Sequence, residues 1–223
     1  MKKKYLYVTD EDLFDSSSLK NPVACLDGKL EKYYPEYFEN NYDLRLLVKH
    51  EPVKAERESS IYNDVFEKIG SNDISVFKDS AVKNKAKKVL LNGFSQEHFD
   101  YIAPYIKDTT EVMYLFKCPR IKDLSVLAEF EKLKCLFIFW NNSLESLWDM
   151  KNNSDLEVLS FVNISKLRDI SGLKNSTVKY ITFDSTGVYP NPKELLIEDI
   201  SAFDKLSGLK HLKLLYKKCK IDY

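Results

Sequence analysis

The chain has 223 residues, of which 44% are hydrophobic and 30% are charged, a composition typical of a folded globular protein and not of a disordered chain. The 34 Lys and Arg residues balance 34 Asp and Glu residues, so no global field draws the chain to nucleic acid or to an anionic membrane. We therefore expect neither a nucleic-acid partner nor a membrane partner.

The first residues of the chain do not match the pattern of a signal peptide. The basic residues 2–4 are followed within a few positions by the acidic residues 10–12, without the apolar stretch of a signal peptide. The longest apolar run, residues 135–140, is far shorter than the ~20 residues that span a bilayer as a helix. Four widely spaced cysteines lack a C-x-x-C pair, which favours reduced, structural thiols: Cys25, Cys118, Cys135 and Cys219. These features predict a cytoplasmic protein.

Residues 1–85 have no internal period and are rich in aromatic residues. Residues 4–8, 44–48 and 74–77 predict strands, and residues 59–69 predict an amphipathic helix that ends at a glycine. An array of repeats otherwise exposes the core at its first unit, so the simplest role for residues 1–85 is an N-terminal α+β cap. A separate binding module is the alternative.

From residue 86 onward, the apolar residues repeat. Segments that start at residues 110, 133, 156 and 178 align with one another. Each unit has two apolar residues two positions apart, as in a strand with one buried face, and then apolar residues at every third position, as in a 3₁₀-like return. The strand pairs are Val89 and Leu91, Met113 and Leu115, Leu136 and Ile138, Leu159 and Phe161, Ile181 and Phe183, and Leu212 and Leu214.

This L-x-x-L-x-L pattern resembles the leucine-rich-repeat family in its irregular bacterial type. The resemblance covers residues 86–223 in about six units and implies an α/β solenoid, with a curved parallel sheet and short helical or 3₁₀ returns behind it. The family's column of Asn or Cys after the strand is matched by Cys118 and Asn141, whose polar atoms are expected to cap backbone groups of the turn. Elsewhere this column holds Phe94, Ile164 and Thr186. The fifth unit contains an insertion around residues 187–192, which is expected to form a loop.

The sequence has none of the common phosphate, dinucleotide, zinc or hydrolase motifs. We therefore expect no cofactor, no metal ion and no catalytic residue. The alternative is an enzyme whose site lies in the N-terminal segment and uses His50 with Asp10 or Glu51.

The residues between the repeat leucines point to the opposite face of the predicted sheet, which is the concave face of a solenoid. In the middle of the array they are apolar or aromatic, where a solvated face would be polar. Aromatic residues are enriched at the centres of protein interfaces. We therefore predict that a protein partner binds an aromatic concave face with a polar rim. The candidate residues are Tyr114, Phe116, Phe137, Phe139, Trp140, Tyr180, Asp184 and Lys213.

Such a face needs a cover, because an exposed apolar strand at residues 135–140 would favour aggregation. Three covers are considered: residues 1–85, a second copy of the chain in a homodimer, and a different partner. Concave repeat surfaces commonly bind partners, which favours the third. On a free face, Phe137→Asp would abolish binding and leave the fold intact. A more specific form of this hypothesis is that the protein is an immunity-type or regulatory inhibitor of a partner enzyme.

Overall fold

The computed structural model describes residues 43–48, 70–71, 78, 81–82, 85–184 and 197–215, and the statements that follow concern these residues. The strands predicted at 4–8 and 74–77, the helix predicted at 59–69 and the insertion at 187–192 lie outside them.

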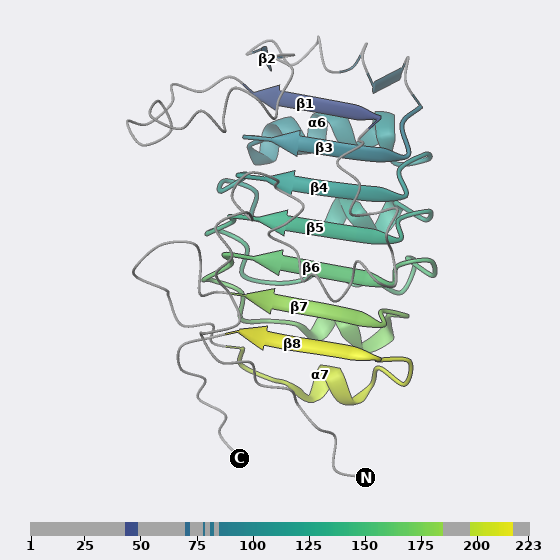
Figure 1. Cartoon of the computed structure of the whole chain (residues 1–223), viewed down its shortest axis with the longest axis vertical. Coiled ribbons are helices and arrows are strands. Elements are labelled where there is room, and N and C mark those ends of the chain that lie inside the picture. The colour runs from purple at the N-terminus through teal and green to yellow at the C-terminus, as the bar shows by residue number, and fades with distance from the viewer. Residues whose placement is uncertain are drawn as a thin grey trace, which may run out of the picture.

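One open, parallel sheet organises the described residues (Figure 1). Its strands are β1 (Leu44–Val48), β2 (Gly70–Ser71), β3 (Lys88–Asn92), β4 (Val112–Phe116), β5 (Cys135–Phe139), β6 (Val158–Val162), β7 (Tyr180–Asp184) and β8 (His211–Leu215). The order across the sheet is β2-β1-β3-β4-β5-β6-β7-β8, so from β3 onward each strand lies beside the next one in the chain. The strand predicted at residues 44–48 is confirmed, and it extends the sheet at β3.

The pairing register confirms the alignment of the units that was made from sequence. Strands β3 to β8 have five residues each and pair from first residue to last. The repeat leucines therefore form two continuous rows across the sheet. One row is Val89, Met113, Leu136, Leu159, Ile181 and Leu212, and the other is Leu91, Leu115, Ile138, Phe161, Phe183 and Leu214.

Short helical segments return the chain from the end of one strand to the start of the next. They are α6 (Gln96–Ile106), η4 (Ser125–Glu129), η5 (Ser171–Asn175) and α7 (Ser201–Asp204). Figure 1 shows α6 behind strands β1 and β3, and α7 at the β8 end of the sheet. These returns make successive strands parallel, and the described residues thus have an α/β fold. No helix in this part of the chain is both long and apolar enough to cross a membrane.

The main core lies between the two rows of repeat leucines and the returns. Phe99 of α6, Leu127 of η4, Leu173 of η5 and Phe203 of α7 belong to this cluster, and each is at most 1% exposed. The period-three residues of the sequence are therefore the side chains through which the returns pack against the sheet.

Cys118 and Asn141 have the capping role that the family resemblance implied. The Asn141 side-chain Nδ2 donates to the carbonyls of Cys118 and Ile121 at 3.0 and 2.8 Å. Its Oδ1 accepts from the backbone N–H groups of Ser143 and Leu144 at 2.8 and 2.9 Å. The thiol of Cys118 lies 3.5 Å from the carbonyl of Leu91, and burial raises its pKa to about 12. Both side chains thus pair backbone groups that are buried away from water.

A second capping asparagine, Asn153, did not emerge from the sequence. Its Nδ2 donates to the carbonyls of Leu127 and Phe130 at 2.8 and 3.0 Å, and its Oδ1 accepts from Trp148 Nε1 at 2.9 Å. Asn153 is fully buried. Its bonds therefore replace the hydrogen bonds to water of two carbonyls in one unit and of the Trp148 indole N–H in the next.

Removing the Asn153 amide should destabilise the fold. We expect Asn153→Ala to lower the free energy of unfolding by roughly 1–3 kcal/mol, because it leaves two carbonyls and one indole N–H buried without partners. Urea denaturation followed by circular dichroism measures this change. The neighbouring Asn152 is exposed, and Asn152→Ala should change the unfolding free energy by less than about 0.5 kcal/mol. Equal effects of the two substitutions would contradict the capping role.

Alternating charges line the edge of the sheet where the strands begin. The residue before each of the strands β3 to β7 is Lys87, Glu111, Lys134, Glu157 and Lys179 in turn. Glu111 pairs with the lysines on both sides, at 2.9 Å to Lys87 and 2.6 Å to Lys134, and Glu157 pairs with Lys179. Hydrogen bonds from Lys134 and then from Lys87 lower the pKa of Glu111 below its ordinary value.

The lowered pKa of Glu111 gives its ion pairs a defined pH dependence. Their contribution to stability is complete above the ordinary pKa of a glutamate, 4.5, and is lost as the pH falls through the lower value of the folded state. Glu111→Gln should therefore reduce the unfolding free energy by about 0.5–1 kcal/mol at pH 7, with the difference from the unsubstituted chain shrinking in acid. Urea titrations between pH 7 and pH 3 measure it, with the exposed Glu145→Gln as the control. A difference that stays constant over this range would refute the assignment.

Candidate functional site

The side chains on the other face of the sheet form a second apolar cluster, which we call the aromatic face. Its members are Leu90, Val112, Tyr114, Phe116, Cys135, Phe137, Phe139, Val158, Val162 and Tyr180, with Trp140 packed against them. They alternate along the strands with the two rows of the main core, as the period of a strand requires. The structure therefore brings together on one face five of the predicted site residues, Tyr114, Phe116, Phe137, Phe139 and Tyr180, and places Trp140 against them.

The rings of the aromatic face contact one another across neighbouring strands. Tyr114 of β4 lies edge-on to Phe137 of β5, with ring centroids 6.2 Å apart. Phe116 of β4 stacks on Phe139 of β5 at 5.3 Å with an interplanar angle of 12°. These separations lie within the range of favourable aromatic pairs, so the fixed register of the strands orders the cluster.

The aromatic face is buried within the single chain. Tyr114 and Phe137 are 0% exposed, Phe139 and Tyr180 are 5% exposed, and Phe116 is 9% exposed. The sequence led us to expect a free surface on which Phe137→Asp would leave the fold intact. In the structure these five side chains are at most 9% exposed, so Phe137→Asp is expected to disturb the fold.

The predicted rim is partly described. Trp140 and Lys213 are half-buried, and the side chain of Asp184 lies outside the described part of the structure. The backbone of Asp184 pairs with that of Leu215 in β8, so Asp184 lies at the end of the aromatic face nearest the C-terminal strand.

Three polar side chains on the aromatic face are buried without a hydrogen-bond partner. They are Asn92, at both of its amide atoms, Ser160 at Oγ and Thr182 at Oγ1. Ser160 and Thr182 lie opposite each other in β6 and β7, so their side chains share the same row of the face. Native cores rarely leave such groups unpaired, because each loses its bonds to water without replacement. Sequence reasoning placed Ser160 and Thr182 on this face, because they lie between the repeat residues of their strands, but it did not reveal that they lack partners.

A left-handed turn follows each of the strands β3 to β6. The residues are Gly93 (φ 73°), Lys117 (φ 49°), Trp140 (φ 63°) and Asn163 (φ 60°). The N–H of this residue donates to the last carbonyl of the next strand in the first three cases, at 2.8–3.1 Å. Glycine and asparagine adopt this conformation most easily, whereas a bulky side chain such as that of Trp140 is strained there. The turn does not itself require a tryptophan.

Lys117 lies between two aromatic rings at the edge of the aromatic face. Its Nζ is 5.7 Å from the centroid of the Phe116 ring and 5.7 Å from that of Trp140. These distances permit a cation–π attraction to both rings. The strand ends of β4 and β5 thus present a cation and a half-buried indole side by side.

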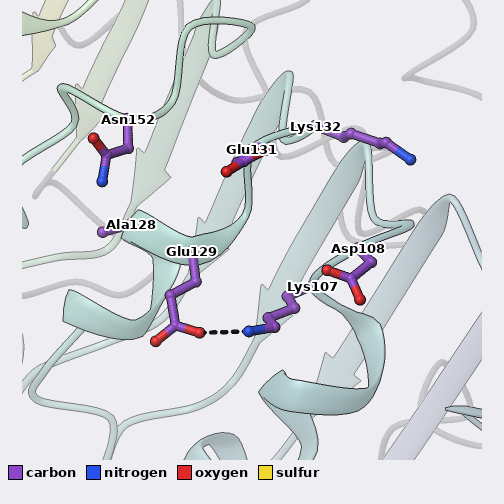
Figure 2. A pocket seen from close by; sticks show the side chains of 7 residues that line it. All are labelled: Lys107, Asp108, Ala128, Glu129, Glu131, Lys132 and Asn152. Atoms are coloured by element: carbon purple, nitrogen blue, oxygen red, sulfur yellow. Dashed lines mark hydrogen bonds and ion pairs between the residues drawn. The ribbon is translucent and has the colours of Figure 1, made fainter.

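The returns enclose a separate, polar pocket of about 400 Å³ (Figure 2). It is lined by Lys107, Asp108, Ala128, Glu129, Glu131, Lys132 and Asn152. Lys107 forms an ion pair with Glu129 at 2.7 Å across it, and this hydrogen bond raises the pKa of Lys107. These charged side chains are mostly solvated, so the pocket lacks the buried, convergent polar groups of a ligand site.

The structure bears on only part of the enzyme alternative. Within the described ranges, no three His, Cys, Asp or Glu side chains are grouped so that they could hold a metal ion. The candidate catalytic residues of the alternative, His50, Asp10 and Glu51, lie outside those ranges.

Comparison of the chain with protein-family models, with curated proteins and with solved structures gave no match.

A packed aromatic face should be sensitive to truncation. We expect Phe137→Ala to lower the free energy of unfolding by about 3–5 kcal/mol, because it removes a fully buried ring from between Tyr114 and the neighbouring strands. Thermal or urea denaturation measures the loss. Val82→Ala is the control, because Val82 is 53% exposed and its truncation should change little. A loss below about 1 kcal/mol for Phe137→Ala would mean that the face is not packed in solution.

Proposed function

We propose that this chain is a leucine-rich-repeat solenoid that binds a protein partner through its aromatic face. The in-register parallel strands, the 3₁₀ returns and the capping roles of Cys118 and Asn141 support the solenoid. The concentration of rings on one face supports a protein as the partner, because aromatic side chains remove a large apolar area from water while few rotors are ordered.

The observation that carries this proposal is the conformation of Trp140. A left-handed backbone costs a non-glycine residue roughly 1–2 kcal/mol, and the equivalent turns use Gly93 and Asn163, which adopt it at little cost. The indole is only half-buried, so the main core does not account for it. Residues held in strained conformations are common at binding sites, where the side chain is needed in one place. We assign Trp140 to partner contact at the edge of the aromatic face.

The chemistry of the site defines the kind of partner. The rings of Trp140 and Phe116, with Lys117 between them, suit an apolar or aromatic side chain flanked by an acidic group. Lys213 of β8 and Asp184 of β7 would supply polar contacts at the opposite end of the face. The partner on this proposal is a protein segment that contacts the half-buried edge of the aromatic face at Trp140.

Photo-crosslinking from position 140 tests the proposal. A benzoylphenylalanine side chain replaces Trp140 in the full chain, and irradiation in cells of the source organism should link it to one defined protein. The same probe at Lys151, an exposed residue in the return of the same unit, should not link to that protein. Recovery of the same set of proteins from both positions, or of none from position 140, would argue against partner binding at this face.

Once the partner is known, Trp140→Asn separates binding from folding. Asparagine occupies the equivalent turn at Asn163, so we expect a change in unfolding free energy of less than about 1 kcal/mol. We expect the dissociation constant for the crosslinked partner, measured by calorimetry, to rise at least tenfold. Unchanged affinity in a folded variant would remove Trp140 from the interface.

A further inference from the structure

We propose that His98 is a proton-sensitive cap on helix α6 and that its protonation loosens the edge of the sheet at which the partner binds. This inference rests on the proposed function, because it takes the strand ends beside Trp140 as the partner's site. It adds a regulatory step, in which a fall in pH lowers the affinity for the partner.

Helix α6 begins with a capping box in which a histidine takes the place of the usual glutamate or glutamine. The N-cap residue is Ser95, and its backbone N–H donates to Nδ1 of His98 at 3.3 Å. The hydroxyl oxygen of Ser95 lies 3.0 Å from the same nitrogen and accepts from the backbone N–H of His98 at 3.4 Å. Because Nδ1 accepts from the backbone of Ser95, this geometry requires a neutral imidazole with no proton on Nδ1.

Protonation of His98 is incompatible with this capping box. It places a hydrogen on Nδ1 that points at the backbone N–H of Ser95. Two donors cannot bond to each other, so the N–H of Ser95 loses its partner. A charged imidazole in the first turn also lies at the positive end of the helix macrodipole, which is unfavourable. Both effects favour opening of the first turn of α6 when His98 is charged.

The surroundings of His98 favour its neutral form in the folded chain. Partial burial is the main cause that lowers the pKa of His98 below its ordinary value of 6.5, while the carboxylate of Glu97 opposes the shift and the guanidinium of Arg120 adds to it. Glu97 belongs to α6 and Arg120 to the return after β4. The contribution of the cap to stability is therefore complete above pH 6.5 and is lost as the pH falls through the lower pKa of the folded state.

The start of α6 is fastened to the return that follows β4. Ser95 forms a parallel β-bridge with Arg120. The side-chain Oε1 of Gln96 accepts from the backbone N–H groups of Lys122 and Asp123, both at 2.9 Å, and its Nε2 donates to the carbonyl of Asp123 at 3.0 Å. The first helical residue of α6 thus pairs three backbone groups of the next unit, so opening of the first turn releases this part of the return.

The same return begins at the edge where the partner is proposed to bind. Its first residue is Lys117, whose Nζ lies 5.7 Å from the ring centroids of both Phe116 and Trp140. Two residues separate Lys117 from the β-bridge at Arg120. A return that is no longer held at Arg120 orders Lys117 less well against Trp140, and the loss of this preorganised arrangement lowers the affinity for a partner.

Amide hydrogen exchange followed by NMR tests the cap in the free chain. The amides to follow are those of Phe99, which donates to the carbonyl of Ser95 at 3.0 Å, and of Asp123, which donates to Gln96. We expect their protection factors, corrected for the intrinsic effect of pH, to fall at least threefold between pH 7.5 and pH 5. The amide of Leu144, which is paired by an asparagine in another unit, should keep its protection.

Two histidine variants separate protonation from packing. His98→Gln keeps a side-chain acceptor that is usual at this position of a capping box but cannot titrate, so Phe99 and Asp123 should stay protected at pH 5. His211→Gln, the same replacement in β8, should retain the loss of protection. Loss of protection in acid by His98→Gln, or none in the unsubstituted chain, would overturn the inference. An equal loss at Leu144 would also overturn it, because acid would then destabilise the whole fold.

The affinity for the crosslinked partner separates this inference from the proposed function. We expect the dissociation constant, measured by calorimetry, to rise between pH 7.5 and pH 5 at least threefold more for the unsubstituted chain than for His98→Gln. If the amides lose protection in acid and no partner crosslinks at position 140, the cap stands and the proposed function fails. If the partner binds both chains with the same pH dependence, the function stands and regulation by His98 is refuted.

Discussion

The structure depends on a register that does not shift. From β3 to β8, each five-residue strand pairs with the next from first residue to last, so every side chain has an equivalent neighbour on the adjacent strand. A slip of one residue would exchange the two faces of a strand, placing core leucines among the aromatic rings. The left-handed turns after β3 to β6 help to hold this register, because in three of them the turn N–H bonds to the end of the next strand. The two apolar clusters are therefore consequences of one pairing pattern.

The two faces differ in how completely their polar groups are paired. In the main core, Asn141 and Asn153 use their amide groups to pair buried backbone groups, and Cys118 places its thiol near buried carbonyls. On the aromatic face, Asn92, Ser160 and Thr182 have no partner at all. A core whose buried polar groups are all hydrogen-bonded is specific and stable. Unpaired buried groups can instead gain hydrogen bonds from a bound partner. The contrast supports a structural role for the first face and a recognition role for the second.

Sequence reasoning predicted the features that recur in each unit. It missed the contacts that occur only once. The strand rows and the capping roles of Cys118 and Asn141 were predictable, because each unit shows the same spacing. Asn153 was missed because no column of the repeat marks it, although it bonds to the preceding unit as Asn141 does. The strain at Trp140 had a usable signal, since Gly93 and Asn163 fill the same position after their strands. The burial of Tyr114 and Phe137 could not be decided from the spacing, because the same alternation fits a free face and a covered one.

The row of charges at the start of the strands limits how such an array can grow. Lysine and glutamate alternate from Lys87 to Lys179, and the ion pairs of Glu111 and Glu157 join one unit to the next. Duplication or loss of a single unit within this stretch would set two like charges side by side, which is unfavourable at that spacing. Duplication or loss of two units would keep the alternation intact. Between β3 and β7, the number of units therefore changes most easily by two, whereas the alternation ends at β8, where Lys210 lies beside Lys179.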